Sequence, residues 1–330
     1  MIVASATAAP TSVVSAGRIL VIKLGALGDF ALAMGPFAAI RRHHANARIT
    51  LLTIPSLVEL AKACGYFDDI WTDSRPNLWN VPSWLALGRR LNDGHFDRVY
   101  DLQTSDRSSF YYRLMSPPFT QKSPEWSGIA RGASHFHTNP RRDFMHTIER
   151  QKEQLALAGI TDVPPPDLSW VQSDISRFRL RPPYVILVPG SSPHRPDKRW
   201  PERQFAQLAV ELLECGVQPV LIGSEAERHV IDGIHNRAPD ARDLCGQTSY
   251  FDIISLARGA IGAVGNDTGP MHLIAAAGSR TVVLFSDASD PSLCAPRGPS
   301  ADKVTVLRRA ALADLPVADV LDAVVPLKPH

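Results

Sequence analysis

Residues 265–278 read G-N-D-T-G-P-M-H-L-I-A-A-A-G and follow an apolar run at 260–264. The run predicts a buried strand, while Pro270 suits the first turn of a helix and Gly278 suits a helix C-terminus. A helix that begins at the end of a strand directs its free N–H groups and the positive end of its dipole above that strand. The stretch therefore predicts an α/β fold with a site for a phosphorylated ligand. Three polar side chains are expected to gather at this site: Asp267, Thr268 and His272.

Buried runs alternate with helical patterns along the rest of the chain. This alternation predicts parallel, doubly wound sheets, and 330 residues are too many for one ordinary core. A proline-rich passage at 162–183 interrupts the pattern, so we expect two Rossmann-like domains with a cleft between them. Residues 116–140 are expected to form a loop. The predicted strands are 18–23, 48–53, 69–72, 98–102, 184–188, 217–222, 241–244, 260–264 and 281–285.

The composition excludes several classes of protein. Hydrophobic residues make up 45% and charged residues 21% of the chain, as in globular proteins. A net charge of +2 leaves no broad footprint for nucleic acid, which is not an expected partner. No run approaches the ~18 apolar residues of a membrane span. The four cysteines are far apart, which argues against a structural zinc site or a disulfide scaffold and fits a reducing cytosol.

The first predicted strand ends in a glycine loop, L-G-A-L-G-D at 24–29. The loop lacks the dinucleotide pattern G-x-G-x-x-G, but Gly28 would let the backbone come close to a ligand. Asp29 stands where a helix begins, and on this loop alone it is equally well a helix cap or a catalytic base. Ligands of open α/β sheets bind beyond the carboxyl ends of the strands. Gln103 and Arg107, which follow the strand at 98–102, are therefore candidates for an acceptor wall.

Three loops of the second half should converge at one sheet edge: 189–198, 223–225 and 265–272. The first loop offers the hydroxyls of two serines and the cation of Lys198, which suit a diphosphate. Glu225 could accept hydrogen bonds from ribose hydroxyls. The alternatives are a surface lysine, a helix-capping glutamate and an ordinary buried histidine in the last loop.

Four motifs together resemble a known family. They are K-L-G-A-L-G-D at 23–29, H-T-I-E-R at 146–150, P-G-S-S at 189–192 followed by K-R-W-P at 198–201, and N-D-T-G-P-M-H at 266–272. In this order and spacing they resemble glycosyltransferase family nine, the ADP-heptose:lipopolysaccharide heptosyltransferases. The resemblance covers residues 18–299. It implies a GT-B fold, an ADP-sugar donor on the C-terminal domain, an acceptor on the N-terminal domain, and inverting transfer without a metal or other cofactor.

The resemblance also implies roles for single residues. Asp29 matches the general base of the family. The residues that match donor-binding positions are Ser191, Ser192 and Lys198 for the diphosphate, Glu225 for the ribose, and Asp267, Thr268, Gly269 and His272 in the last motif. Gly28, Gln103 and Arg107 remain the acceptor-side candidates. One departure is F-S-D-A-S-D-P at 285–291, where many members have the shorter F-G-P-T-D-P.

Composition, pattern and the resemblance together divide the chain into four expected segments. Residues 1–17 are an expected disordered leader, 18–175 the acceptor-binding domain, 176–310 the nucleotide-sugar-binding domain, and 311–330 a tail that could pack back on the first domain. Expected partners are a nucleotide-diphosphate sugar, with ADP-heptose foremost, and a glycan or lipid-linked acceptor.

Membrane association and two other functions stay open at this point. The expected location is the cytoplasm, and peripheral binding to the cytoplasmic face of the inner membrane is an open alternative. Basic clusters at 41–44 and 141–142 and the side chains of Trp79, Trp84 and Trp126 either face a lipid-linked acidic glycan or are ordinary surface and core residues. Alternative functions are a nucleotide-sugar epimerase, which would need no acceptor, and a non-catalytic nucleotide-sugar sensor, which would need no base.

Overall fold

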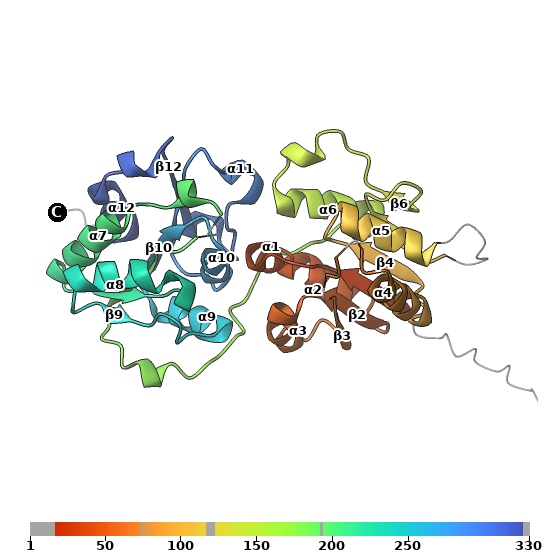
Figure 1. Cartoon of the computed structure of the whole chain (residues 1–330), viewed down its shortest axis with the longest axis horizontal. Helices are drawn as coiled ribbons and strands as arrows, with labels where there is room; N and C mark the ends of the chain where they lie inside the picture. The colour runs from red at the N-terminus through yellow and green to blue at the C-terminus, as the bar shows by residue number, and fades with distance from the viewer. Residues whose placement is uncertain (1–16, 74, 78, 117–122, 192–193, 326–330) are drawn as a thin grey trace, which may run out of the picture.

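The computed structural model describes residues 17–325 except 74, 78, 117–122 and 192–193. It has two parallel six-stranded sheets, each flanked by helices, one in each half of the chain (Figure 1). The first sheet has the order β3-β2-β1-β4-β5-β6 and the second β12-β11-β10-β7-β8-β9. When the second order is reversed and renumbered from β7, both sheets have the doubly wound order 3-2-1-4-5-6. The prediction of two Rossmann-like domains is thus confirmed.

The first domain alternates strands and helices around β1, whose sequence R-I-L-V-I is buried after its first residue. Continuous burial is typical of a parallel strand covered on both faces. Its elements are β1 (Arg18–Ile22), α1 (Leu27–Leu32), α2 (Met34–His43), β2 (Arg48–Thr53), η1 (Pro55–Leu57), α3 (Val58–Ala63), β3 (Asp69–Thr72), α4 (Val81–Asp93), β4 (Arg98–Asp101), α5 (Asp106–Met115), β5 (Glu125–Gly128), β6 (His135–Phe136), η2 (Arg142–Phe144) and α6 (Thr147–Leu157).

The second domain repeats this plan after a linker that contains η3 (Ser176–Phe178). Strands β7 and β11 match the predicted strands residue for residue. The elements are β7 (Tyr184–Val188), η4 (Pro196–Lys198), α7 (Glu202–Glu214), β8 (Gln218–Leu221), η5 (Glu225–Glu227), α8 (Arg228–Arg237), β9 (Arg242–Asp243), α9 (Tyr250–Gly259), β10 (Gly262–Asn266), α10 (Gly269–Ala276), β11 (Thr281–Phe285), α11 (Pro291–Cys294), η6 (Ala301–Lys303), β12 (Val304–Arg308), η7 (Leu312–Asp314) and α12 (Val317–Val324).

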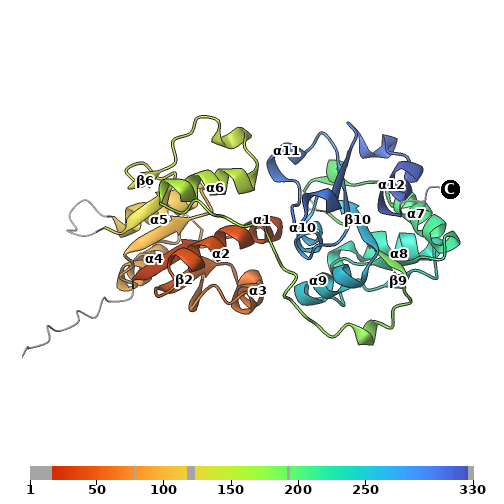
Figure 2. The same ribbon diagram turned by 180° about the vertical axis from the view of Figure 1, so that it is seen from behind.

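The two domains pack directly against each other. One cluster of buried apolar side chains includes Phe30 and Phe37 of the first domain and Met271 and Ile274 of the second. Figures 1 and 2 show α1 and α10 side by side at the boundary between the domains. The linker joins this contact, because Leu168 is buried and donates its N–H to the carbonyl of Ala276 at 2.8 Å. The exact boundary at 175/176 remains a prediction.

The expectation of a loop over 116–140 is wrong in part. Strands β5 and β6 lie within it, and β5 extends the first sheet by pairing with β4 in parallel, with Val99 opposite Trp126. Trp126 is fully buried, so its burial in the core holds the strand in place. These strands escape prediction because they are only four and two residues long and lie among turn-forming residues. Residues 117–122 lie outside the described part of the chain.

The expectation that the tail at 311–330 packs back on the first domain is wrong for its described part, 311–325. Helix α12 packs against α7, β10 and β11 of the second domain. Val320 and Val324 are buried there, and the indole of Trp200 donates to the carbonyl of Leu315 at 3.1 Å. The predicted leader lies almost wholly outside the described residues. None of the described helices is both long enough and apolar enough to cross a membrane.

The basic cluster at 41–44 is occupied by contacts within the first domain. Arg41 forms an ion pair of 2.6 Å with Asp68, and Arg42 pairs with Asp162 at 3.1 Å. His44 shares a hydrogen bond of 2.8 Å with the hydroxyl of Tyr100. These partners agree with the structural interpretation of the cluster rather than with binding of an acidic substrate.

Candidate active site

The starts of α1 and α10 meet across the domain boundary. They follow β1 and β10, each of which is a central strand of its sheet. A Cβ atom on Gly28 would lie 2.7 Å from Cδ2 of His272, and one on Gly269 would lie 2.9 Å from Cβ of Leu27. Each predicted glycine motif thus leaves room for the other domain at the point of closest approach. The structure brings these acceptor-side and donor-side candidates together.

Asp29 lies at this junction in the first turn of α1 and is partly buried. It is not the helix cap, because Ala26 is the N-cap residue and the helix start has no side-chain cap. The negative charge of Asp29 acts on Lys23 within its own domain and on His272 across the boundary. It also acts on Cys294 of the second domain. A carboxylate of the first domain therefore faces side chains of the second, and its role as a base remains a prediction.

Sequence reasoning gave no role to three further charged groups: Lys23 and Arg150, which interact with Asp29, and Asp101, which interacts with Lys23. Lys23 is buried beneath the glycine loop and donates to the carbonyl of Leu102 at 3.1 Å. Burial lowers the pKa of Lys23, while the charges of Asp29 and Asp101 act in the opposite direction. Burial raises the pKa of Asp101 to about 6. The positive charge of Arg150 also interacts with Asp29. The position of Lys23, a charged residue at the end of an apolar strand, is the sequence signal that could have identified it as a site residue.

On the second domain, Lys198 and Asp267 form an ion pair of 2.5 Å. Only 16% of the lysine side chain and 8% of the aspartate side chain are exposed. Lys198 ends η4 and Asp267 follows β10, so the pair links two of the three predicted donor loops. The pair places a cation beside the start of α10, where an anion would also meet the positive end of the helix dipole.

The side chain of Asn266 joins the first and third donor loops. Sequence analysis named this residue only as part of the motif N-D-T-G-P-M-H. Its side chain is fully buried and accepts the N–H of Trp200 at 2.9 Å. Its amide nitrogen donates to the carbonyl of Pro189 at 2.7 Å. Ser191, which follows in this loop, is buried, and its hydroxyl accepts a hydrogen bond of 3.0 Å from Arg199. Ser192, the other predicted diphosphate contact, lies outside the described residues.

His272 is buried on α10 and interacts electrostatically with Asp267 and with Asp29 of the other domain. Burial lowers its pKa to about 4, although the two carboxylates raise it, so the imidazole is neutral at pH 7. Its Nδ1 atom is buried and has no hydrogen-bond partner among the described residues. Thr268 is the N-cap residue of α10 and its side chain makes no capping hydrogen bond. Both side chains are thus placed at the helix start where the sequence predicts them.

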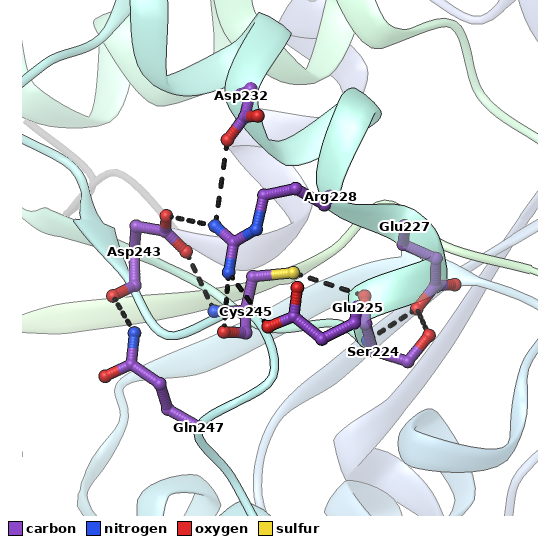
Figure 3. Close-up of polar contacts among 8 residues, drawn as sticks. All are labelled: Ser224, Glu225, Glu227, Arg228, Asp232, Asp243, Cys245 and Gln247. Atoms are coloured by element: carbon purple, nitrogen blue, oxygen red, sulfur yellow. Dashed lines mark hydrogen bonds and ion pairs between the residues drawn. The ribbon is translucent and has the colours of Figure 1, made fainter.

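Glu225 begins η5, the helical turn that follows β8, and Figure 3 shows its side chain beside that of Arg228. Its side chain is 71% exposed, and it accepts a hydrogen bond of 3.4 Å from Arg228. Arg228 also pairs with Asp243 at 2.7 Å and donates to the carbonyl of Cys245 at 2.8 Å. These acidic partners raise the pKa of Arg228, with Glu225 contributing most. The arginine orients Glu225 while leaving most of the carboxylate open to solvent.

The two residues of the predicted acceptor wall make contacts within the first domain, and their role toward an acceptor remains a prediction. Gln103 accepts the N–H of Leu24 at 2.8 Å, and Arg75 donates to the carbonyl of the same residue. Two side chains from other loops thus hold both polar backbone groups of Leu24, in the loop that leads to Asp29. Arg107 donates to a carbonyl at 3.1 Å and lies 5.0 Å from the ring centre of Trp84.

The H-T-I-E-R motif contacts the second domain at the start of α6. His146 accepts the N–H of Ile148 with Nδ1, so Nε2 carries the proton that it donates to the carbonyl of Ala295 at 3.0 Å. Thr147 donates to the carbonyl of Leu293 at 3.2 Å. Glu149 forms an ion pair of 2.5 Å with Arg297. The motif thus fixes the two domains relative to each other, a role that the sequence alone did not indicate.

Within the described part of the chain, no group of three or more His, Cys, Asp or Glu side chains could hold a metal ion. The arrangement is therefore a two-domain α/β site with a carboxylate on one side and a lysine and a helix start on the other. Sites of this kind bind phosphorylated ligands at the helix start.

The sequence profile of glycosyltransferase family 9 (heptosyltransferase) matches residues 84–323. The chain belongs to this family. Among curated proteins it is similar to lipopolysaccharide heptosyltransferase 2 of Escherichia coli K12, with 29% identity over 231 residues. That match covers 62% of this chain and 63% of the relative, so it spans less than two thirds of the relative's length.

Solved structures share the fold along almost the whole chain. The structure of the E. coli ADP-heptose lps heptosyltransferase II has a TM-score of 0.74 at 22% identity, covering 93% of this chain and 97% of that one. E. coli heptosyltransferase WaaC with ADP has a TM-score of 0.70 at 19% identity, covering 92% and 97%. At these identities the similarity establishes the fold, which is GT-B as predicted.

Proposed function

We propose that this protein is an inverting, metal-independent glycosyltransferase that moves heptose from ADP-heptose to a lipopolysaccharide-core or related glycan. The observation that carries the proposal is the position of Asp29. Its carboxylate lies on the first domain and acts electrostatically on His272 of the second, which in turn interacts with Lys198. A base and a site for a leaving diphosphate are thus on opposite sides of one domain boundary.

The reaction needs one bond to form while another breaks. An acceptor hydroxyl oxygen attacks the anomeric carbon from the face opposite the diphosphate, and the bond from that carbon to the diphosphate oxygen breaks. ADP leaves with the electron pair, and the carboxylate of Asp29 takes the hydroxyl proton. Attack from the opposite face inverts the configuration. General-base help of this kind contributes about 10²–10⁴-fold in rate.

Negative charge develops on the departing diphosphate, and the second domain offers groups that stabilise it. Lys198 supplies a cation, oriented by its 2.5 Å pair with Asp267. The backbone N–H groups at Gly269 and the hydroxyl of Thr268 stand at the start of α10, where the helix dipole favours an anion. Ser191 adds a polar group of the adjoining loop. Ser192 keeps this role on sequence grounds alone.

The family and the ribose position support ADP-heptose as the donor. The E. coli heptosyltransferase WaaC, a structural relative, is described with ADP. In this chain Glu225, oriented by Arg228, would accept hydrogen bonds from the two ribose hydroxyls. His272, neutral and buried, would line the donor site as a hydrogen-bonding group without adding charge.

The acceptor belongs on the first domain, beside Asp29. In this proposal the acceptor meets the first domain at the glycine loop that contains Gly28. Gln103 holds that loop through Leu24, and Arg107 offers a cation in the first turn of α5. An anionic, lipid-linked glycan suits this side. The proposed location is the cytoplasm, with peripheral association at the cytoplasmic face of the inner membrane.

A thermal-shift panel with ADP, UDP, GDP and ADP-heptose tests the donor. A ligand at about 100 times its dissociation constant adds about 2.7 kcal/mol of stability, which the melting temperature reports. We expect stabilisation by ADP and ADP-heptose. Stabilisation by UDP without ADP would refute the ADP-heptose assignment while leaving the fold intact. Turnover of the donor with no acceptor present would instead indicate the epimerase.

The variant Asp29→Asn tests the base. It should keep the ADP-induced thermal shift and lose about 10²–10⁴-fold in transfer rate, because the amide cannot take the proton. Asp302→Asn is the matched control, since Asp302 is an exposed aspartate on η6 of the second domain. Full transfer by Asp29→Asn would remove Asp29 from the mechanism.

A further inference from the structure

The glycine loop at 24–28 leaves the first sheet at Leu24 and leads into α1, which carries Asp29. Helix α1 has six residues, and its start has no side-chain cap. Gly25 within the loop is buried and has a φ of +113°, a left-handed conformation that glycine adopts without strain. Neither the helix start nor the loop itself therefore fixes the path of the chain, and contacts from other segments must do so.

The backbone N–H of Leu24 is held by a side chain instead of by a strand. The ladder between β1 and β4 ends with a hydrogen bond of 3.1 Å from the N–H of Leu102 to the carbonyl of Ile22. One step further along a parallel ladder, the N–H of Leu24 would bond to the carbonyl of Leu102. That carbonyl instead accepts a hydrogen bond of 3.1 Å from the ammonium of Lys23. The N–H of buried Leu24 donates to Oε1 of Gln103 at 2.8 Å, so Gln103 replaces the strand as its acceptor.

The backbone of Gln103 is itself fixed by a buried carboxylate. One oxygen of Asp101, a fully buried residue, accepts the N–H groups of Gln103 at 3.1 Å and of Thr104 at 2.9 Å. On the other side of the glycine loop, Arg75 donates to the carbonyl of Leu24. Both polar backbone groups of Leu24 are thus tied to loops that follow neighbouring strands. The bond from Gln103 has a rigid base, because Asp101 holds the chain from which its side chain extends.

We propose that Gln103 is a positioning residue for Asp29 and acts on the transfer reaction through the glycine loop. The inference deepens the proposed function and rests on it, since it requires Asp29 to be the base. A loop displaced by about 1 Å would carry the carboxylate away from the acceptor hydroxyl, and a misplacement of this size can cost about 10²-fold in rate. Donor binding should not change, because Lys198 and Asp267 belong to the second domain.

Two substitutions of similar size test this role in the full-length protein. Gln103→Met removes the accepting oxygen, whereas Gln103→Glu keeps an oxygen that can accept the N–H of Leu24. Gln103→Met should lower the kcat of transfer by about 10- to 100-fold, while the KM of the acceptor and the ADP-induced thermal shift stay at their wild-type values. Gln103→Glu should restore most of the lost kcat. A purely structural role would not separate kcat from KM in this way.

Asn92→Leu is the matched control for a loss of stability. The side chain of Asn92 joins α4 to α5 by donating to the carbonyl of Leu114 at 3.0 Å, a side-chain-to-backbone bond of the same kind in the same domain. Asn92→Leu should lower the urea midpoint and keep the wild-type kcat. If it loses kcat in proportion to its lost stability, as Gln103→Met does, then instability accounts for both losses and the proposal is overturned.

Hydrogen exchange reports the loop contact without any transfer reaction. The amide proton of Leu24 should exchange slowly in the wild type and in Gln103→Glu, and about 10-fold faster or more in Gln103→Met. Fast exchange in the wild type would overturn the proposal even if no variant folds. A raised acceptor KM at unchanged kcat would also overturn it and assign Gln103 to direct acceptor contact. Full transfer by Asp29→Asn would refute the base itself, whereas normal kcat in Gln103→Met beside an inactive Asp29→Asn would refute the positioning role alone.

Discussion

The variant Asn266→Ala should destabilise the second domain because Asn266 holds two loops with one buried side chain. The side chains of Asn266 and Trp200 are both fully buried. The side-chain oxygen of Asn266 accepts a hydrogen bond of 2.9 Å from the backbone N–H of Trp200. Its own amide donates to the carbonyl of Pro189 at 2.7 Å. Alanine leaves one buried donor and one buried acceptor without partners, at about 1–3 kcal/mol each. The expected loss is therefore about 2–6 kcal/mol in the free energy of unfolding.

Hydrogen exchange measures this loss at the site. The amide proton of Trp200, followed by mass spectrometry of the peptide that contains it, should exchange much faster in Asn266→Ala, and the urea midpoint should fall. ADP affinity should fall as well, because the loop that carries Ser191 moves. Gln207→Ala is the control: its exposed amide donates to Glu211 one turn along the same helix, so a change within about 0.5 kcal/mol is expected. If the two variants are equally stable, the anchoring role of Asn266 is refuted.

Two further predictions concern charge. Lys198→Ala should weaken ADP binding by about 10- to 100-fold, measured by calorimetry, because a hydrogen bond to a charged group contributes about 1.5–3 kcal/mol; an unchanged affinity would place Lys198 outside the donor site. Burial, followed by neighbouring basic side chains, lowers the pKa of His44 from 6.5 to about 4. The unfolded chain therefore binds a proton between pH 6.5 and 4 that the folded chain does not, so this contribution to stability is complete above pH 6.5 and is lost as the pH falls. His44→Gln should flatten the decline of the urea midpoint across that window, and an unchanged slope would contradict the assignment.

The sequence predicts most of the framework because the framework is built from buried, continuous apolar runs. Strands β7 and β11 have five buried residues each and were predicted to the residue. The start of α10 is set by Pro270 in its first turn, as expected. Short or half-buried strands are different. Strand β12 is only partly buried along its length and pairs with β11 alone, so its pattern carries little signal and no strand was predicted there.

The sequence singled out residues of the candidate site but not the contacts that support them. Asp29 and His272 were singled out by their positions at helix starts beside glycine loops and by the resemblance to glycosyltransferase family nine, and their roles remain predictions. Gln103 was predicted as an acceptor-side residue, and its bond to the backbone N–H of Leu24 was not predicted. Asn266 and Lys23 act through contacts with segments distant in the sequence. Such contacts depend on the packing of loops, which no local pattern specifies.

The symmetry of the two sheets explains why motifs more than 200 residues apart form one site. Both sheets have the order 3-2-1-4-5-6, and in such sheets the loops after the first and fourth strands diverge and open a crevice. In the first domain these are the loops after β1, which leads to Asp29, and after β4, which carries Gln103. In the second they are the loops after β7, with Ser191, and after β10, with Asp267. The contact between α1 and α10 sets the two crevices against each other. A ligand that spans both crevices therefore reaches a base in one domain and a phosphate site in the other, which is what transfer between two substrates requires.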